Sequence, residues 1–344
     1  MGKNFCAGNR FRKWANRTFP ILTLTIVLLL ALGSVQGFSA ASDVEGKPYH
    51  VRKPSPRVDP QALVTVIGSW DAGTPWISEK SLDCPDDMVA LNGGVESEGS
   101  FLLLASSPIV SGVTMKDLAD GSHPAPTGWY FRVLGNGGEP AIAKAAVICA
   151  EFDNIGTHIF STTTVGLSGE VIGPCPAGEA AIGGGIDPLV SDENFRIVAS
   201  MPWNITSDAD SWYGAMWYSA GGTIEKSFKI GAICQPVSDL RLAMTSEYIP
   251  SWTTGESILA CQDGEILLGG GVYVDSSYAG GFLQYESPIF PGPTYLLDMS
   301  DGIHEAPAAW RTVVVNISTS TLFHATGVLC ESKNLLVFLP LINR

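Results

Sequence analysis

A segment that occurs three times is the feature that most constrains how this chain can fold. The three copies align without a gap, and their first cysteines lie 91 and 86 residues apart. The aligned segments are Cys84–Val95, Cys175–Ile186 and Cys261–Val272. Self-similarity at a nearly fixed period predicts one supersecondary unit written three times.

Further landmarks follow each segment in the same order. An apolar run ends in proline, a tryptophan opens a strand-like stretch, and a second cysteine follows that tryptophan by 20 to 22 residues. The tryptophans and second cysteines are Trp129 and Cys149, Trp212 and Cys234, and Trp310 and Cys330. We therefore place the copies at residues 60–151, 152–236 and 237–334, followed by a short C-terminal tail at 335–344.

Each copy reads as several short β-strands. Apolar and β-branched segments are punctuated by Gly and Pro, and no helical periodicity persists outside the first 41 residues. The predicted fold class is all-β, built from three tandem, disulfide-stapled antiparallel repeats. The copies are either three small sandwiches or parts of one pseudo-threefold core. The glycine triplets favour a bulge or a close backbone approach over a phosphate loop, because no Lys and no helix follow them.

The N-terminus predicts export. Five basic residues and no acidic residue precede the apolar run 21–32, and small residues follow it. We expect a signal peptide at residues 1–41 and a Pro-rich spacer at 42–59, with an uncleaved signal anchor as the alternative. The apolar run is shorter than a transmembrane helix requires. Cleavage leaves 15 basic and 34 acidic residues, a net charge of −19, which argues against nucleic acid as a partner.

Six of the seven cysteines lie in the three copies, and the seventh is Cys6 in the signal segment. An even number of cysteines in an exported chain predicts disulfides. Two pairings respect the repeat. In the preferred one each copy closes on itself, as Cys84–Cys149, Cys175–Cys234 and Cys261–Cys330. In the other, Cys149 pairs with Cys175, Cys234 with Cys261, and Cys84 with Cys330.

The landmarks Cys-Pro-x-Gly, Gly-Gly-Gly, Trp and Cys resemble a domain that recurs in exported bacterial proteins, mostly without an assigned function. More distantly, a threefold disulfide-bonded β chain with Cys-Pro-x-Gly resembles the vitelline membrane outer layer protein family. That resemblance implies a β-prism, although the repeat of about 90 residues is longer than one prism face needs. The first resemblance covers most of residues 60–334 and implies a scaffold rather than a reaction. With the export signal, we expect the protein in the secreted fraction or at the extracytoplasmic cell surface.

Candidates for ligand contact come from two matched loops. The matched residues are Asp120, His123 and Trp129 in the first copy and Asp301, His304 and Trp310 in the third. An aspartate and a histidine in one loop can orient a sugar hydroxyl or hold a metal weakly. The alternative is an Asp-Gly turn whose histidine packs on the tryptophan edge. We predict no cofactor and no catalytic or metal-ligating residue.

Aromatic residues near turns and strand ends are further candidates, because an exposed ring can stack on the apolar face of a sugar. These residues are Trp203, Trp217, Tyr218, Trp252, Tyr273, Tyr278 and Tyr295. The resulting hypothesis is a non-enzymatic protein that binds a glycan or another surface component, or that forms part of the envelope. The alternative is a secreted polysaccharide hydrolase with a carboxylate site in one copy.

Overall fold

The computed structural model describes residues 63–332, with gaps at 73–76, 100, 136–141, 153, 190–193, 204–209, 219–224, 237–239 and 276–279. The expected signal peptide, spacer and C-terminal tail lie outside the described residues. Within the described residues the chain forms β-strands and short 3-10 turns and no α-helix, which confirms the predicted fold class. None of the helices described there is long and apolar enough to cross a membrane.

The three copies contribute similar sets of strands. The first contributes β1 (Leu63–Asp71), β2 (Ile77–Asp83), β3 (Val89–Ser97), β4 (Phe101–Val110), β5 (Val113–Thr114), η2 (Met115–Asp117), β6 (Gly121–His123), β7 (Gly128–Gly135) and β8 (Ile142–Ala150). The second contributes β9 (Gly156–Val165), β10 (Ser168–Pro174), β11 (Ala180–Pro188), β12 (Phe195–Trp203), β13 (Ser211–Tyr218) and β14 (Glu225–Gln235). The third contributes β15 (Leu240–Ile249), β16 (Thr253–Ala260), β17 (Glu265–Val274), β18 (Gly281–Ile289), η3 (Leu296–Asp298), β19 (Gly302–Glu305), β20 (Ala309–Asn316) and β21 (Leu322–Ser332).

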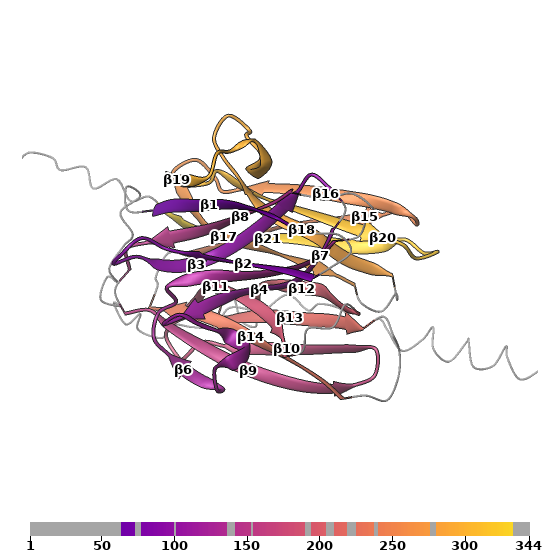
Figure 1. The fold of residues 1–344 in the computed structure, drawn as a ribbon, viewed down its shortest axis with the longest axis horizontal. Coiled ribbons are helices and arrows are strands. Elements are labelled where there is room, and N and C mark those ends of the chain that lie inside the picture. Colours follow the sequence, from indigo (N-terminus) through magenta and orange to yellow (C-terminus); the bar gives the residue numbers. More distant parts are fainter. Residues whose placement is uncertain are drawn as a thin grey trace, which may run out of the picture. The chain divides into compact units, whose positions relative to one another are not determined.

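These strands form three antiparallel sheets, and every sheet combines two copies (Figure 1). Sheet I has the order β16-β20-β18-β3-β8-β1-β19 and joins the third copy to the first. Sheet II, β2-β7-β4-β11-β14-β9-β6, joins the first copy to the second. Sheet III, β10-β13-β12-β17-β21-β15, joins the second copy to the third. Each copy thus divides its strands between two sheets and gives three or four strands to the path of each.

The copies therefore share one core instead of folding as separate beads. One cluster of buried apolar side chains draws on all three copies. Leu91, Ile182 and Leu268 occupy matched β-bulges in this cluster, and each is 0% exposed. A β-bulge turns an extra side chain out of the ladder. Of the two arrangements expected from the sequence, the structure has the pseudo-threefold, prism-like one.

The last glycine of each triplet lies where two copies meet. A Cβ atom added to Gly185 would lie 2.3 Å from the carbonyl oxygen of Ser106, and one added to Gly271 would lie 2.1 Å from that of Ser200. Real Cβ atoms do not approach backbone oxygen so closely. These glycines therefore allow a strand of one copy to pair with a strand of the next.

The three matched tryptophans fill the space between the sheets. Trp129, Trp212 and Trp310 are at most 1% exposed, and the indole of Trp129 packs on Gly93, where a Cβ atom would clash with the ring. Its N–H donates to the Ser106 hydroxyl at 3.0 Å. From the sequence, Trp129 and Trp310 are candidates for ligand contact. Their 0% exposure leaves no ring face open to a ligand, so they are core residues.

Three disulfides close the copies on themselves. They join Cys84 to Cys149, Cys175 to Cys234 and Cys261 to Cys330, over separations of 65, 59 and 69 residues. The chained pairing is absent. In the chain-entropy account, each such loop stabilises the folded state by about 4 kcal/mol. The first cysteine of each disulfide directly follows β2, β10 or β16, and the second lies in β8, β14 or β21, which belongs to a different sheet.

Candidate binding groove

Straps cover the outer faces of sheets I and II. We call the segments 111–127 and 290–308 straps; they connect β4 to β7 and β18 to β20. Each strap forms a 3-10 turn and then a short strand that pairs with the edge strand of the next copy, β6 with β9 and β19 with β1. Figure 1 shows β19 beside β1 and β6 beside β9.

Asp120 and Asp301 fasten these straps. The Asp301 carboxylate accepts hydrogen bonds from the Ser69 amide at 3.1 Å and the Ser69 hydroxyl at 2.5 Å. Asp120 receives the same two bonds from Ser161, at 3.1 and 2.5 Å. The bond from the Ser69 hydroxyl lowers the pKa of Asp301. Both aspartates therefore act as latches between copies, and their carboxylates are already engaged within the protein.

His123 and His304 make matched local contacts. In each, Nε2 donates to the carbonyl oxygen four residues earlier, at 2.8 Å. The His304 ring packs edge-on against Phe290 at 6.3 Å between centroids, and not against the tryptophan expected from the sequence. These bonds hold each histidine within its own strap. The structure thus brings Asp and His together as parts of a strap, and it separates both from the buried tryptophans.

Two side chains hold each 3-10 turn from below. The Lys144 ammonium donates to the Leu297 carbonyl at 2.9 Å and to the Met299 carbonyl. The Lys229 ammonium holds the turn of the other strap in the same way, through the carbonyls of Lys116 and Leu118. Lysine therefore satisfies the carbonyl oxygens at the end of each turn.

The second anchor is an acidic residue two positions after the last glycine of the aligned segment. Glu96 accepts backbone hydrogen bonds from the turn of the sheet I strap and forms an ion pair with Arg311. Asp187 occupies the matched place in sheet II, 3.8 Å from the Arg132 guanidinium. Burial raises the pKa of Asp187 to about 7, because the loss of solvation outweighs the attraction of Arg132.

Sheet III has neither anchor. The residue that matches Glu96 and Asp187 is Tyr273, two positions after the last glycine of its triplet. The residue that matches Lys144 and Lys229, five positions before the second cysteine, is Ala325. The loss of both anchors accompanies the loss of a strap, because no described segment of the second copy crosses this face.

The consequence for solvent exposure is large. Ile67 in β1 and Ile159 in β9 are 3% and 0% exposed beneath the straps, whereas the matched residue in β15, Met244, is 52% exposed. We matched these three residues by the pairing register of β1 with β8, of β9 with β14 and of β15 with β21. Within the described residues, the outer face of sheet III is therefore the uncovered one of the three.

This uncovered face contains a groove of about 620 Å³. Side chains from β12, β15, β17 and β21 line it: Met201, Trp203, Met244, Thr245, Ser246, Tyr273, Phe323 and Ala325. The lining contains no charged residue. The groove therefore suits an apolar or aromatic group with a few polar contacts at its rim.

Aromatic rings extend in a row across the groove. The ring centroids of Trp203 and Tyr213 are 5.1 Å apart, those of Tyr213 and Tyr273 6.2 Å, and those of Tyr273 and Phe323 6.2 Å. Tyr248, which is 72% exposed, continues the row at 5.5 Å from Phe323. These spacings are typical of favourable aromatic pairs. Tyr213 is buried, and the other four rings form a preorganised surface.

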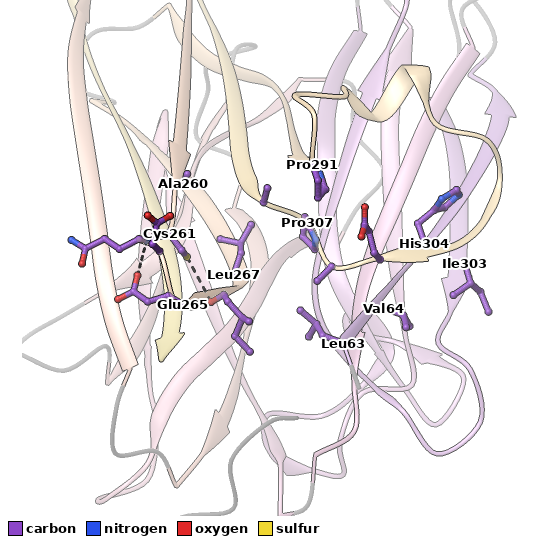
Figure 2. A pocket seen from close by; sticks show the side chains of 17 residues that line it. Leu63, Val64, Ala260, Cys261, Glu265, Leu267, Pro291, Ile303, His304 and Pro307 are labelled. Atoms are coloured by element: carbon purple, nitrogen blue, oxygen red, sulfur yellow. Dashed lines mark hydrogen bonds between the residues drawn. The ribbon is translucent and has the colours of Figure 1, made fainter. Parts of the chain in front are cut away.

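A second cavity, of about 880 Å³, lies beside the strap of sheet I (Figure 2). Figure 2 shows Cys261 and Glu265 on one side and Ile303 and His304 on the other. The Glu265 carboxylate receives hydrogen bonds from Arg241 and from the Gln262 amide, and the Arg241 bond lowers its pKa. Glu265 therefore stays ionised and paired, which does not suit a general acid.

Two further possibilities, a metal site and a glycosylation site, can be assessed. Two clusters of described side chains could ligate a metal: His158, Glu179 and Cys234, and Cys261, Glu265 and Cys330. Their cysteines are in disulfides, so no thiolate is available at either cluster. Asn316, Ile317 and Ser318 match the N-glycosylation pattern, and the Asn316 side chain is buried. Its side-chain amide donates to the carbonyls of Ile249, Pro250 and Ser320, which leaves it engaged inside the protein.

Of the aromatic candidates, Trp203 and Tyr273 lie in the groove. Trp252 and Tyr295 are exposed elsewhere, and Tyr278 lies outside the described residues. Sequence reasoning missed Phe323, Met244 and Ala325. A position-by-position alignment of the three copies contains this signal. Before the second cysteine it places Lys144, Lys229 and Ala325 at one position, and after the glycines it places Glu96, Asp187 and Tyr273 at another.

No protein-family model matches the chain, and no curated protein matches it.

Proposed function

We propose that this chain is an exported, non-enzymatic binding protein that attaches to a glycan or another surface component through the groove on sheet III. The observation that carries the proposal is the difference between the three outer faces: two are closed by straps, and the third exposes a row of aromatic rings. An exposed apolar patch of this kind on a folded protein is typical of an interaction site. The N-terminal sequence and the three disulfides support export.

The lining of the groove argues against the hydrolase alternative. Glycoside hydrolysis uses two carboxyl groups facing the substrate, and the groove lining contains none. Among the described acids with raised pKa, Glu96, Asp187 and Glu286 are buried within the sheets, where a polysaccharide has no access. The cavity beside Glu265 contains acids, but Glu265 itself is paired with Arg241.

The proposal is tested by binding of the full mature chain to intact cells and to a glycan array. The double variant Trp203→Ala/Tyr273→Ala removes two rings from the groove. We expect at least about tenfold weaker binding, since a stacked aromatic contributes about 1 kcal/mol. The matched control is Trp252→Asn, which removes a ring that is 68% exposed at a turn outside the groove. Asparagine suits the left-handed backbone there, where φ is 59°.

Equal binding by the wild type and the double variant would contradict the proposal. So would turnover of a polysaccharide by the wild type, because it would establish the hydrolase alternative.

A further inference from the structure

No described strand pairs with the outer edge of β15 in sheet III, whereas the matched strands β1 and β9 are each paired with a strap strand at that edge. β1 pairs with β19 over Val64–Ile67, and β9 pairs with β6. β15 ends the strand order of sheet III, and no described strand pairs with its outer edge. An open strand edge beside an apolar groove is the arrangement that accepts an added strand.

β15 keeps the feature to which the straps are fastened. Ser69 and Ser161, whose amides and hydroxyls bind the strap aspartates, align with Ser246 in β15. Ser246 is exposed and lines the groove. Sheet III therefore has the serine that binds the aspartate on the other two sheets, but no described strap supplies an aspartate to it.

The connection in the second copy is too short to supply a strap. Seven residues separate β12 from β13, whereas 17 separate β4 from β7 and 19 separate β18 from β20. Seven extended residues span at most about 25 Å. A path from β12 out to β15 and back to β13 crosses seven inter-strand spacings, about 33 Å. The second copy therefore cannot cover its sheet as the others do.

Resting on the proposed function, we infer that the surface component is a protein, and that an extended peptide of this partner adds to β15 and lays an apolar side chain in the groove. The peptide takes the place of the missing strap. Its backbone pairs antiparallel with Arg241–Met244, which align with Val64–Ile67 of β1. An aspartate of the peptide accepts the amide and hydroxyl hydrogens of Ser246.

The straps of the chain show which peptide sequence fits. In both, a buried apolar residue lies five positions before the aspartate, Met115 before Asp120 and Leu296 before Asp301. A glycine with positive φ follows each aspartate, Gly121 at 123° and Gly302 at 131°. The partner therefore carries an apolar residue, four intervening residues and Asp-Gly. Because Ala325 replaces lysine beneath this site, a large or aromatic residue fits at the apolar position.

A glycan is the less favoured ligand for the same groove. Sugar recognition combines ring stacking with several polar groups that bind hydroxyls, whereas this lining offers Thr245 and Ser246 beside two methionines and Phe323. The outer edge of β15 also presents a row of backbone groups with which no described strand pairs, and a peptide strand matches such a row whereas a sugar does not.

The test uses a synthetic peptide with the sequence of residues 294–305, which contains Leu296 and Asp301, added in trans to the full chain. Binding is measured by fluorescence anisotropy of the labelled peptide. We expect saturable binding to the wild type, at least tenfold weaker binding to Met244→Glu, and weaker binding of the Leu296→Ala/Asp301→Ala peptide. The matched control is Ile258→Glu, at a 47% exposed apolar residue on β16, the edge strand of sheet I.

Absence of saturable binding, or equal binding to the wild type and Met244→Glu, would overturn the peptide assignment. If the peptide fails while Trp203→Ala/Tyr273→Ala still weakens attachment to cells or glycans, the peptide assignment falls and the proposed function stands. If attachment to cells does not depend on the groove, the proposed function falls. Concentration-dependent dimerisation abolished by Met244→Glu would assign the edge to a second copy of the chain, and would also overturn the inference.

Discussion

The outer faces of sheets I and III are built on the same strand plan but have different surfaces. On sheet I, Lys144 and Glu96 hold a 3-10 turn whose Leu296 is 0% exposed over β8 and β1. On sheet III, Ala325 and Tyr273 stand at the matched places, and Met244 is 52% exposed. Sheet II resembles sheet I in each respect, with Lys229 and Asp187.

This difference separates the residues that maintain the fold from those free to specialise. The cysteines, the glycine at each join and the tryptophans are the same in all three copies, because every copy must pair with its neighbour and close its loop. Within the part of the chain that the structure describes, the strap and its two anchors occur on two of the three sheets. Without a strap and anchors, sheet III exposes an apolar face. An exposed apolar face is either an interaction site or a cause of aggregation.

The largest expected effect comes from truncating the apolar residue at the matched edge position. Ile67→Ala removes a side chain that is 3% exposed beneath the strap of sheet I, and we expect it to lower the free energy of unfolding by about 3 kcal/mol. Met244→Ala at the matched position on sheet III is expected to change it by less than about 0.5 kcal/mol. Urea unfolding measures both. Similar losses in the two variants would mean that sheet III is covered as sheet I is.

A smaller effect on stability is expected at Asp187, the buried acid of sheet II that Tyr273 replaces on sheet III. The pKa of Asp187 is about 7 in the folded protein and about 3.9 in an unfolded chain. The folded state therefore binds the extra proton between these values, and the contribution of Asp187 to stability falls as pH rises from about 4 to 7. Asp187→Asn removes this dependence.

From pH 4 to pH 8, the free energy of unfolding of Asp187→Asn should rise by on the order of 2 kcal/mol relative to that of the wild type. The pKa shift sets an upper limit of about 4 kcal/mol for this change. The expected value is smaller because solvent relaxation reduces the penalty of burying a charge. Denaturation midpoints at the two pH values measure the gain. Tyr273→Phe, at the matched place on sheet III, is the control and should show no such trend, because its raised pKa keeps the tyrosine neutral across this range. A constant difference between Asp187→Asn and the wild type would contradict this account of the anchor.

The smallest effect is expected at the latch. Asp301→Ala removes two hydrogen bonds from Ser69 at an exposed site, and we expect a loss of less than about 1 kcal/mol at pH 7. Since the folded pKa of Asp301 is lowered, this loss should vanish as pH falls through that pKa. Ser246→Ala on sheet III should leave the stability unchanged. A loss in Ser246→Ala equal to that in Asp301→Ala would show that a latch is closed on sheet III as well.

Much of the fold was predictable from the repeat itself. The matched cysteines, glycines and tryptophans indicated an all-β chain of three similar units, because each must satisfy the same local geometry. The exchange of strands between copies was not predictable, since it depends on which neighbour pairs with β4, β12 and β18 across the joins. Pairing of this kind is set by the core as a whole and leaves no periodic signal.

The site was harder to predict than the fold. Asp120, His123, Asp301 and His304 were noticed because polar residues in matched loops suggest ligand contact, yet the structure uses them to hold the straps. Trp203 and Tyr273 were found among the aromatic candidates. What distinguishes the site is a difference between copies, and a search for shared motifs passes over a position such as Ala325, where the shared lysine is missing.

The central claim is that, of the matched strands β1, β9 and β15, only β15 has no described strand paired with its outer edge. Hydrogen exchange followed by mass spectrometry tests this claim most directly. Peptides covering 240–246 in β15 are to be compared with those covering 63–69 in β1 and 156–161 in β9. We predict that outward-facing amides of β15 exchange much faster than their counterparts beneath the straps, because no described strand pairs with them. Addition of the 294–305 peptide should slow that exchange. Equal protection of β15, β1 and β9 in the protein alone would contradict the claim.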